Sequence, residues 1–213
     1  MKTRISWIFY CLVSFMLLPS LSAAERFVTN ESNGFTWIQQ GKAYPILVDS
    51  QEDKGVLRAV ANLQTDAGKV TGATPEIIHS PSGNRMLIVG SVENSSWIKQ
   101  LVQAGKIPAA DLKGKREKYI LQTVKQPVEG VEEAIVIAGS DKRGTIYGIY
   151  ELSRQMGVSP WYFWADVPVE KHDIISIKEG VYTDGEPAVK YRGIFLNDEW
   201  PSLGGWASAT FGG

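Results

Sequence analysis

The stretch EAIVIAGSDKRGTIYGIYELSRQMG, Glu133 to Gly157, decides the fold class because it joins an apolar strand directly to a capped helix. The run EAIVIAGS (133–140) has the composition of a strand. Ser140 or Asp141 can cap the helix by accepting backbone N–H bonds. Gly157, followed by Pro160, is typical of a helix end. One apolar helix face is expected from the spacing of Ile146, Ile149, Tyr150 and Met156.

Further strands and helices are predicted upstream of this stretch. Apolar runs predict strands at Tyr44–Val48 and Arg85–Ser91, and alternation predicts another at Tyr119–Val124. The last of these is followed by VEGVE (128–132), whose Gly130 suits a hairpin turn into the 133–140 strand. A helix from Ser95 to Ala104 is also expected.

A long helix is predicted after the first strand. Asp49, Ser50 and Asp53 offer helix-starting side chains, and Gly68 and Gly72 offer stop signals. The apolar face is predicted from the spacing of Leu57, Val60, Ala61 and Gln64. These elements together predict a small α/β (α+β) domain whose strand order cannot be derived.

The N-terminus has the order of a secretory signal peptide. Lys2 and Arg4 precede an apolar run from Ile5 to Leu18, which is too short for a comfortable membrane span. Ser22 and Ala24 stand where a signal peptidase reads, so we expect cleavage after residue 24 and export to a periplasm or the extracellular space. The one cysteine, Cys11, would leave with this peptide, and the exported chain would have no disulfide.

Charge and histidine content exclude several classes of protein. Without the signal peptide, 20 basic residues face 23 acidic ones, so the basic face that nucleic acid requires is not expected. The two histidines, His79 and His172, lie far apart in sequence, and no metal site is expected from them.

The C-terminal third carries two long motif blocks. The first, GSDKRGTIYGIYELSRQMGVSPWYFWADVPV, begins at Gly139 and contains Trp161 and Trp164. The second, KYRGIFLNDEWPSLGGW, runs from Lys190 to Trp206. Together they resemble the N-terminal region of family 115 glycoside hydrolases, which are α-glucuronidases acting on glucuronoxylan.

The resemblance implies a division into domains. Residues 1–24 would be the signal peptide, 25–181 the N-terminal α/β domain, 182–187 a linker, and 188–213 the start of a truncated catalytic (β/α)8 barrel. KYRGIFLND would be the first barrel strand, whose carboxyl end is where barrel enzymes assemble their sites. A barrel takes about 250 residues, so we expect this chain to be an inactive N-terminal fragment of a larger enzyme.

The resemblance also implies the site residues. Asn197, Asp198, Glu199 and Trp206 are expected to bind substrate, Asp198 by bridging sugar hydroxyls and Trp206 by stacking. The alternatives are that Asp198 caps the following turn and that Trp206 or Trp200 covers the barrel rim. The family inverts, which needs an acid and a base roughly 6.5–9.5 Å apart, and these are expected beyond residue 213.

Other side chains in the two blocks have structural interpretations. Trp161 and Trp164 are expected to pack between the domain and the barrel, with a part in the substrate cleft as the alternative. Lys190 and Arg192 lie too early in the strand to hold the uronate, and a structural ion pair is favoured for them.

The implied partners are glucuronoxylan or aldouronic acid oligosaccharides, with no cofactor for the chemistry. No nucleic acid and no membrane association after signal cleavage are expected, and the resemblance allows a homodimer of the full-length enzyme. Two alternatives remain: another barrel glycosidase with a similar leading domain, and a non-catalytic carbohydrate-binding or accessory module.

Overall fold

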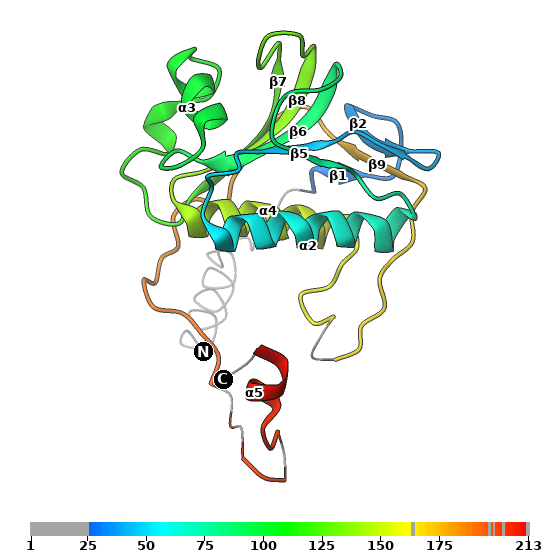
Figure 1. Cartoon of the computed structure of the whole chain (residues 1–213), viewed down its shortest axis with the longest axis vertical. Coiled ribbons are helices and arrows are strands. Elements are labelled where there is room, and N and C mark those ends of the chain that lie inside the picture. Colours follow the sequence, from blue (N-terminus) through cyan, green and yellow to red (C-terminus); the bar gives the residue numbers. More distant parts are fainter. Residues whose placement is uncertain (1–25, 163–164, 196, 198, 202, 212–213) are drawn as a thin grey trace, which may run out of the picture.

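The structure, a computed structural model, describes residues 26–162, 165–195, 197, 199–201 and 203–211 (Figure 1). The expected signal peptide lies outside the described residues, as do Trp164 and Asp198. Within the described part, no helix has both the length and the apolar composition needed to cross a membrane.

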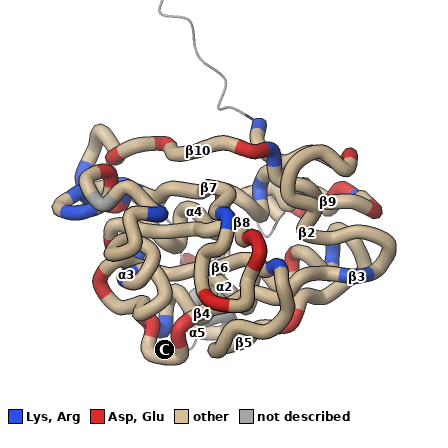
Figure 2. The backbone as a smooth tube through the Cα atoms, turned by 90° about the horizontal axis from the view of Figure 1, so that it is seen from above, with Lys and Arg blue, Asp and Glu red and all other residues tan. Residues whose placement is uncertain are grey.

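A six-stranded mixed sheet forms the centre of the domain, and Figure 2 shows its strands side by side. Four strands run parallel in the order β5-β4-β6-β8, whereas β7 and then β10 are antiparallel to their neighbours. The strands are β10 (Val181–Tyr182), β7 (Tyr119–Lys125), β8 (Glu133–Gly139), β6 (Arg85–Ser91), β4 (Ile46–Val48) and β5 (Ile77–Ile78). The strands predicted at 44–48, 85–91, 119–124 and 133–140 and the 128–132 hairpin are confirmed, and the structure supplies the strand order.

A second, four-stranded sheet lies beside the first and joins the two ends of the domain. Its order is β1-β9-β2-β3, with all neighbours antiparallel. The strands are β1 (Val28–Thr29), β9 (Ile174–Ile177), β2 (Phe35–Gln39) and β3 (Lys42–Ala43). Val28 pairs with Ile177, so the first described residues are held next to the end of the domain.

Helices cover both faces of the six-stranded sheet and make three layers (Figure 1). On one face α2 (Lys54–Thr71) and α4 (Lys142–Met156) bury a core that also includes residues of the four-stranded sheet. On the other face α3 (Ser96–Gln103), followed by the short 3-10 helix η1 (Ala109–Asp111), covers a smaller core. The strands between the two cores are therefore apolar on both sides, as β8 illustrates.

Helix α4 approaches β7 closely because it carries glycine at the contact. A Cβ atom on Gly144 would stand 2.2 Å from the carbonyl oxygen of Lys118, and one on Gly148 would stand 3.0 Å from the Tyr119 ring. Asp141 is the N-cap, accepting from the Gly144 N–H at 2.8 Å, and Gly157 ends the helix in a left-handed conformation. Of the two capping candidates, the structure therefore selects Asp141.

The predicted apolar faces of α2 and α4 need correction. In α2, Val60 is buried, but Ala61 is exposed and Leu57 and Gln64 are only partly buried. The buried α2 residues are Val56, Ala59, Val60, Leu63, Asp66, Ala67 and Val70. In α4, Tyr150 is 43% exposed, because it lies on the side of the helix that faces away from the sheet.

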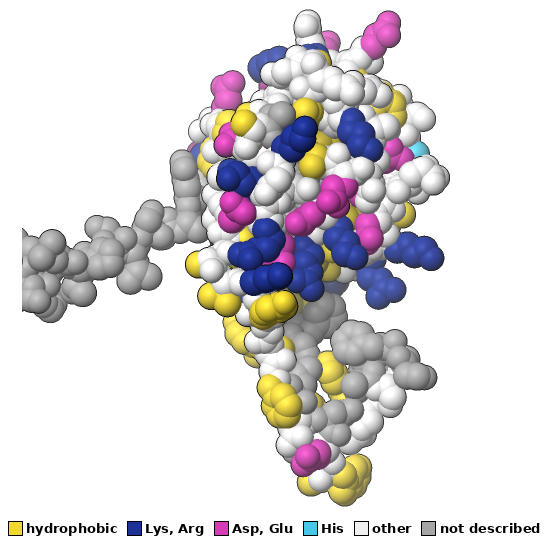
Figure 3. Space-filling model, turned by 90° about the vertical axis from the view of Figure 1, so that its left-hand side faces the viewer, with side chains coloured by type: hydrophobic (Ala, Val, Ile, Leu, Met, Phe, Trp, Pro, Cys, Tyr) yellow, Lys and Arg dark blue, Asp and Glu magenta, His cyan; other side chains and the backbone are white. Residues whose placement is uncertain are grey.

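The strand predicted at the second motif block is not formed among the described residues. Residues 190–195 have no regular secondary structure, and a short helix, α5 (Trp206–Phe211), follows. A parallel strand needs neighbours that satisfy its backbone groups, and no described strand pairs with this segment. Figure 3 shows hydrophobic side chains along this tail, and those that are exposed include Val189, Tyr191, Ile194, Phe195 and Trp200.

Candidate functional site

The described members of the predicted substrate-binding set, Asn197, Glu199 and Trp206, lie on the tail after residue 192. Asn197 and Glu199 are exposed, and Trp206 is partly buried at the start of α5. The Glu199 carbonyl accepts hydrogen bonds from the Leu203 and Gly204 N–H groups at 3.1 and 3.3 Å, which forms a turn. The structure thus places Asn197 and Glu199 on one short segment, and their role stays a prediction.

Two tryptophans of the motif blocks, Trp161 and Trp200, have exposed side chains. Trp200 is 86% exposed and lies against Gly204, where a Cβ atom would stand 2.8 Å from its ring. Trp161, expected to pack between the domain and a barrel, is largely exposed in the loop after α4. Neither ring belongs to a buried core of the described residues.

The carboxyl ends of the parallel strands, a common place for sites in α/β folds, are occupied by internal hydrogen bonds. The buried Glu52 carboxylate accepts from the N–H and hydroxyl of Ser91 at 2.8 and 2.9 Å. Asp49 accepts from the N–H and hydroxyl of Ser96, and these bonds lower the pKa of Asp49 although burial opposes the shift. These polar groups hold helix starts and strand ends together.

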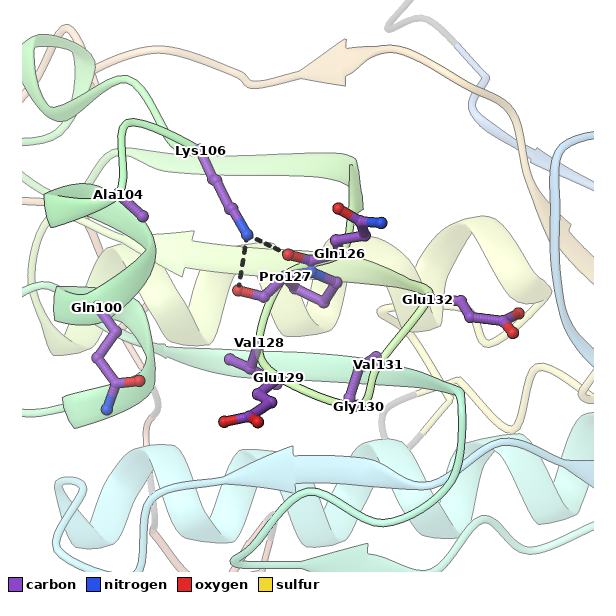
Figure 4. A pocket seen from close by; sticks show the side chains of 10 residues that line it. All are labelled: Gln100, Ala104, Lys106, Gln126, Pro127, Val128, Glu129, Gly130, Val131 and Glu132. Atoms are coloured by element: carbon purple, nitrogen blue, oxygen red, sulfur yellow. Dashed lines mark hydrogen bonds between the residues drawn. The ribbon is translucent and has the colours of Figure 1, made fainter.

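A hollow of about 700 Å³ lies between the end of α3 and the β7–β8 hairpin (Figure 4). Lys106 reaches across it, and its ammonium donates to the backbone carbonyls of Gln126 and Pro127. Glu132 points away from the hollow. The cation that could attract an acidic sugar is therefore engaged by the hairpin backbone.

A groove of about 600 Å³ runs between the outer sides of α2 and α4. Asn62 donates to the Tyr150 hydroxyl at 2.7 Å across the groove. Asp66 lies 3.9 Å from Lys69, and burial raises the pKa of its carboxyl. Glu151 pairs with Arg154 at 2.5 Å. Asp66, Lys69, Glu151 and Arg154 of the groove thus pair with one another.

No metal site is indicated within the described ranges, where His, Cys, Asp and Glu side chains form no cluster of three or more with suitable spacing.

The residues leading out of the domain are anchored by the segment that precedes β7. We call residues 183–192 the exit segment. Arg116 donates from its backbone N–H to Glu186 at 2.9 Å and from its guanidinium to the Pro187 carbonyl at 2.6 Å. The Tyr119 hydroxyl donates to Asp184 at 2.9 Å, and burial together with the Asp184 charge raises the pKa of Tyr119.

Arg192 completes this anchoring and confirms the predicted structural ion pair. Its guanidinium pairs with the Glu117 carboxylate and donates to the Tyr147 hydroxyl at 3.0 Å. Arg143 of α4 donates to the same carboxylate at 3.1 Å. The hydrogen bond from Arg192, helped by that from Arg143, lowers the pKa of Glu117.

Glu117 could not be recognised as a buried residue from the sequence. It stands in the charged run KREK (115–118), where no periodic pattern distinguishes the one buried carboxylate from solvated neighbours. Its burial follows from contacts with Asp141 and Arg143, more than 20 residues away.

Comparison with known proteins identifies the class. Residues 39–152 match the family model "Glycosyl hydrolase family 67 N-terminus", and residues 184–213 match the model "Glycosyl hydrolase family 115". The α/β domain is therefore an N-terminal domain of the kind that precedes a glycoside hydrolase.

A solved structure gives the particular family. The chain is 35% identical to a family 115 4-O-methyl-α-glucuronidase with specificity for decorated arabinogalactans, with a TM-score of 0.66 over 83% of this chain. This chain belongs to glycoside hydrolase family 115. It spans only 22% of the length of that glucuronidase.

Other solved structures match less well. They include the Streptomyces plicatus β-hexosaminidase, at 16% identity and a TM-score of 0.43 over 75% of this chain and 25% of that one. The family 20 β-N-acetylhexosaminidase from Streptomyces coelicolor A3(2), also 16% identical, has a TM-score of 0.42 over the same shares. No curated protein sequence matches the chain.

Proposed function

We propose that this chain is the N-terminal part of an exported α-glucuronidase that releases (4-O-methyl)-glucuronic acid from a plant polysaccharide with inversion at the anomeric carbon. The observation that carries the proposal is the 35% identity to a family 115 4-O-methyl-α-glucuronidase over 83% of the chain. The match of residues 184–213 to the family 115 model adds support at the tail, where the predicted site residues lie.

In this proposal the domain of residues 25–181 supports the site and the tail contributes to it. Asn197, Asp198 and Glu199 bind sugar hydroxyls, and Trp206 stacks on a pyranose face. The residues following 187 are the first part of a barrel, and the general acid and base come from later strands. Neighbouring side chains on an extended segment point to opposite sides, so Asp198 and Glu199 are not proposed as the acid–base pair.

Two polysaccharides are candidate substrates. The resemblance of the motif blocks favours glucuronoxylan, whereas the similar solved enzyme is described as specific for decorated arabinogalactans. The chemistry at the glucuronic acid is the same in both, and the difference lies in the sugar that carries it.

The test uses the gene product that continues past Gly213, incubated separately with aldouronic acids from glucuronoxylan and with a glucuronate-decorated arabinogalactan. We expect release of 4-O-methyl-glucuronic acid from the aldouronic acids at the higher kcat/KM, with the β-anomer appearing first in the NMR spectrum. Faster release from the arabinogalactan would overturn the choice of substrate, release of the α-anomer would overturn inversion, and no release from either would overturn the enzyme proposal.

Export is the remaining part of the proposal and rests on the order of charges and apolar residues in 1–24. We expect the exported protein to begin at Glu25, as determined by N-terminal sequencing of the secreted or periplasmic fraction. A protein that retains residues 1–24 and stays in the cytoplasm would contradict export.

A further inference from the structure

Glu117 is a buried carboxylate at the point where the domain meets the exit segment. The residue is 6% exposed and its backbone has φ 54°, in the left-handed region. Such a conformation is unfavourable for a residue with a side chain, and an unpaired buried carboxylate would be more so. The position is therefore held by its surroundings.

Those surroundings are the starts of two rigid elements. The Glu117 N–H donates to the Asp141 carboxylate at 2.8 Å, and Asp141 is also the N-cap of α4. Arg143, in the first turn of α4, donates to the Glu117 carboxylate. Glu117 itself lies two residues before β7. Its carboxylate is thus held by Arg143 of α4, and its backbone by Asp141 and the start of β7.

The second oxygen of this carboxylate, Oε2, accepts from the guanidinium of Arg192, in the second motif block. Charge-assisted bonds between guanidinium and carboxylate are among the strongest available to side chains. The other ion pair of the exit segment, Lys115–Glu186, has both side chains more than 40% exposed, and such pairs contribute little. Of these two ion pairs, only Glu117–Arg192 has a buried side chain, that of Glu117.

We propose that Glu117 is a positioning residue: through Arg192 it fixes the direction in which the chain leaves the domain toward Asn197 and Glu199. Asn197 lies five residues after Arg192, a reach of at most about 18 Å when fully extended. A change of direction at Arg192 would therefore displace the sugar-binding groups. The inference rests on the proposed function for its effect on substrate, but not for its effect on the segment.

The first test measures the direction of the segment in this chain. Spin labels are placed at F195C and R58C, both exposed positions, in protein lacking residues 1–24 and hence Cys11. We expect one narrow distance distribution by electron paramagnetic resonance, at least twofold broader in Glu117→Gln and in Arg192→Gln, and largely restored in Arg192→Lys. Arg192→Gln leaves the Glu117–Arg143 pair in place, so it remains informative if Glu117→Gln fails to fold.

Glu133→Gln is the matched control. Glu133 is likewise buried, at 7% exposed, and likewise has two cationic partners, Arg85 and Lys125, but it lies at the other end of β8. We expect this variant to keep the narrow distribution. An unchanged distribution in Arg192→Gln, or equal broadening in Glu133→Gln, would overturn the inference.

The second test measures catalysis in the longer gene product. We expect Arg192→Gln to lower kcat/KM for aldouronic acids at least tenfold, since a displacement of about 1 Å can cost 10²-fold, and Glu133→Gln to leave it within twofold. Broadened distances with unchanged kcat/KM would overturn the positioning role. A wild-type product that releases no glucuronate would instead overturn the proposed function, and the distance measurements would still decide the inference.

Discussion

At the scale of single residues, Gly144 tests how closely α4 lies on β7. Ala is the better helix former by about 1 kcal/mol, so Gly144→Ala would stabilise a free helix. Here the new Cβ would stand 2.2 Å from the Lys118 carbonyl oxygen, which is backbone and cannot move aside. We expect Gly144→Ala to lower the free energy of unfolding by about 1–3 kcal/mol, measured by urea denaturation.

Gly193→Ala is the control for that substitution. A Cβ atom there would have no neighbour within 4 Å, and the backbone is not in the left-handed region. Its free energy of unfolding should stay within about 0.5 kcal/mol of wild type. A Gly144→Ala protein as stable as Gly193→Ala would show that α4 does not approach β7 as described.

Glu117 and Glu133 give the stability a pH dependence of known sign. Hydrogen bonds from Arg192 and Arg143 lower the pKa of Glu117, and those from Lys125 and Arg85 lower the pKa of Glu133 although burial opposes the shift. A carboxyl whose pKa is lower in the folded than in the unfolded protein stabilises the fold at pH values above its unfolded pKa, near 4.5. This stabilisation is lost as the pH falls through the folded pKa.

We therefore expect the free energy of unfolding to fall as the pH drops below about 4.5, with a smaller fall in Glu133→Gln. Asp66 acts in the opposite direction, since burial raises the pKa of its carboxyl. Urea denaturation of both proteins at a series of pH values checks this. Parallel profiles for wild type and Glu133→Gln would contradict the assigned pairing of Glu133.

At the scale of elements, α2 tests which helix face meets the sheet. Leu63 is fully buried and Leu57 only partly. We expect Leu63→Ala to cost about 2–5 kcal/mol and Leu57→Ala clearly less, by urea denaturation. A larger loss of stability in Leu57→Ala than in Leu63→Ala would instead support the buried face predicted from the sequence.

Most elements could be predicted from the sequence, because their signals are local. The 85–91 strand, the 128–132 hairpin and the Asp141 cap follow from apolar runs, Gly130 and capping chemistry. The burial of α2 was less predictable because Ala59, Leu63 and Ala67 lie on one helix face as consistently as Leu57, Val60 and Ala61 do, and only the sheet selects between them.

The tail and the candidate site depend on longer-range contacts. An apolar run such as GIFL predicts a strand only if neighbouring strands exist to pair with it, and none of the described strands does so. The ion pair of Arg192 could be predicted from its place early in the segment, but its partner Glu117 could not. A buried glutamate in a charged run is recognised only once α4 and β7 are placed beside it.

At the scale of the whole molecule, we propose that the described domain supports a site to which later residues also contribute. The polar groups at its strand ends and the Lys106 ammonium beside the β7–β8 hairpin are engaged in internal hydrogen bonds, and Asn197 and Glu199 lie on an exposed tail. We expect the 213-residue chain to release no glucuronate from aldouronic acids, as measured by chromatography of the products. Turnover above the rate of a buffer control would contradict the assignment of the acid and base to later residues.

The most direct measurement of the central claim is kcat/KM on aldouronic acids for the longer gene product carrying Asp198→Ala, with Glu129→Ala, an exposed hairpin carboxylate, as control. If residues 197–199 enter the glucuronic acid site, Asp198→Ala should lose activity on the order of 10²-fold or more, and Glu129→Ala should match wild type. An Asp198→Ala enzyme with wild-type kcat/KM would contradict the claim that this tail forms part of the site.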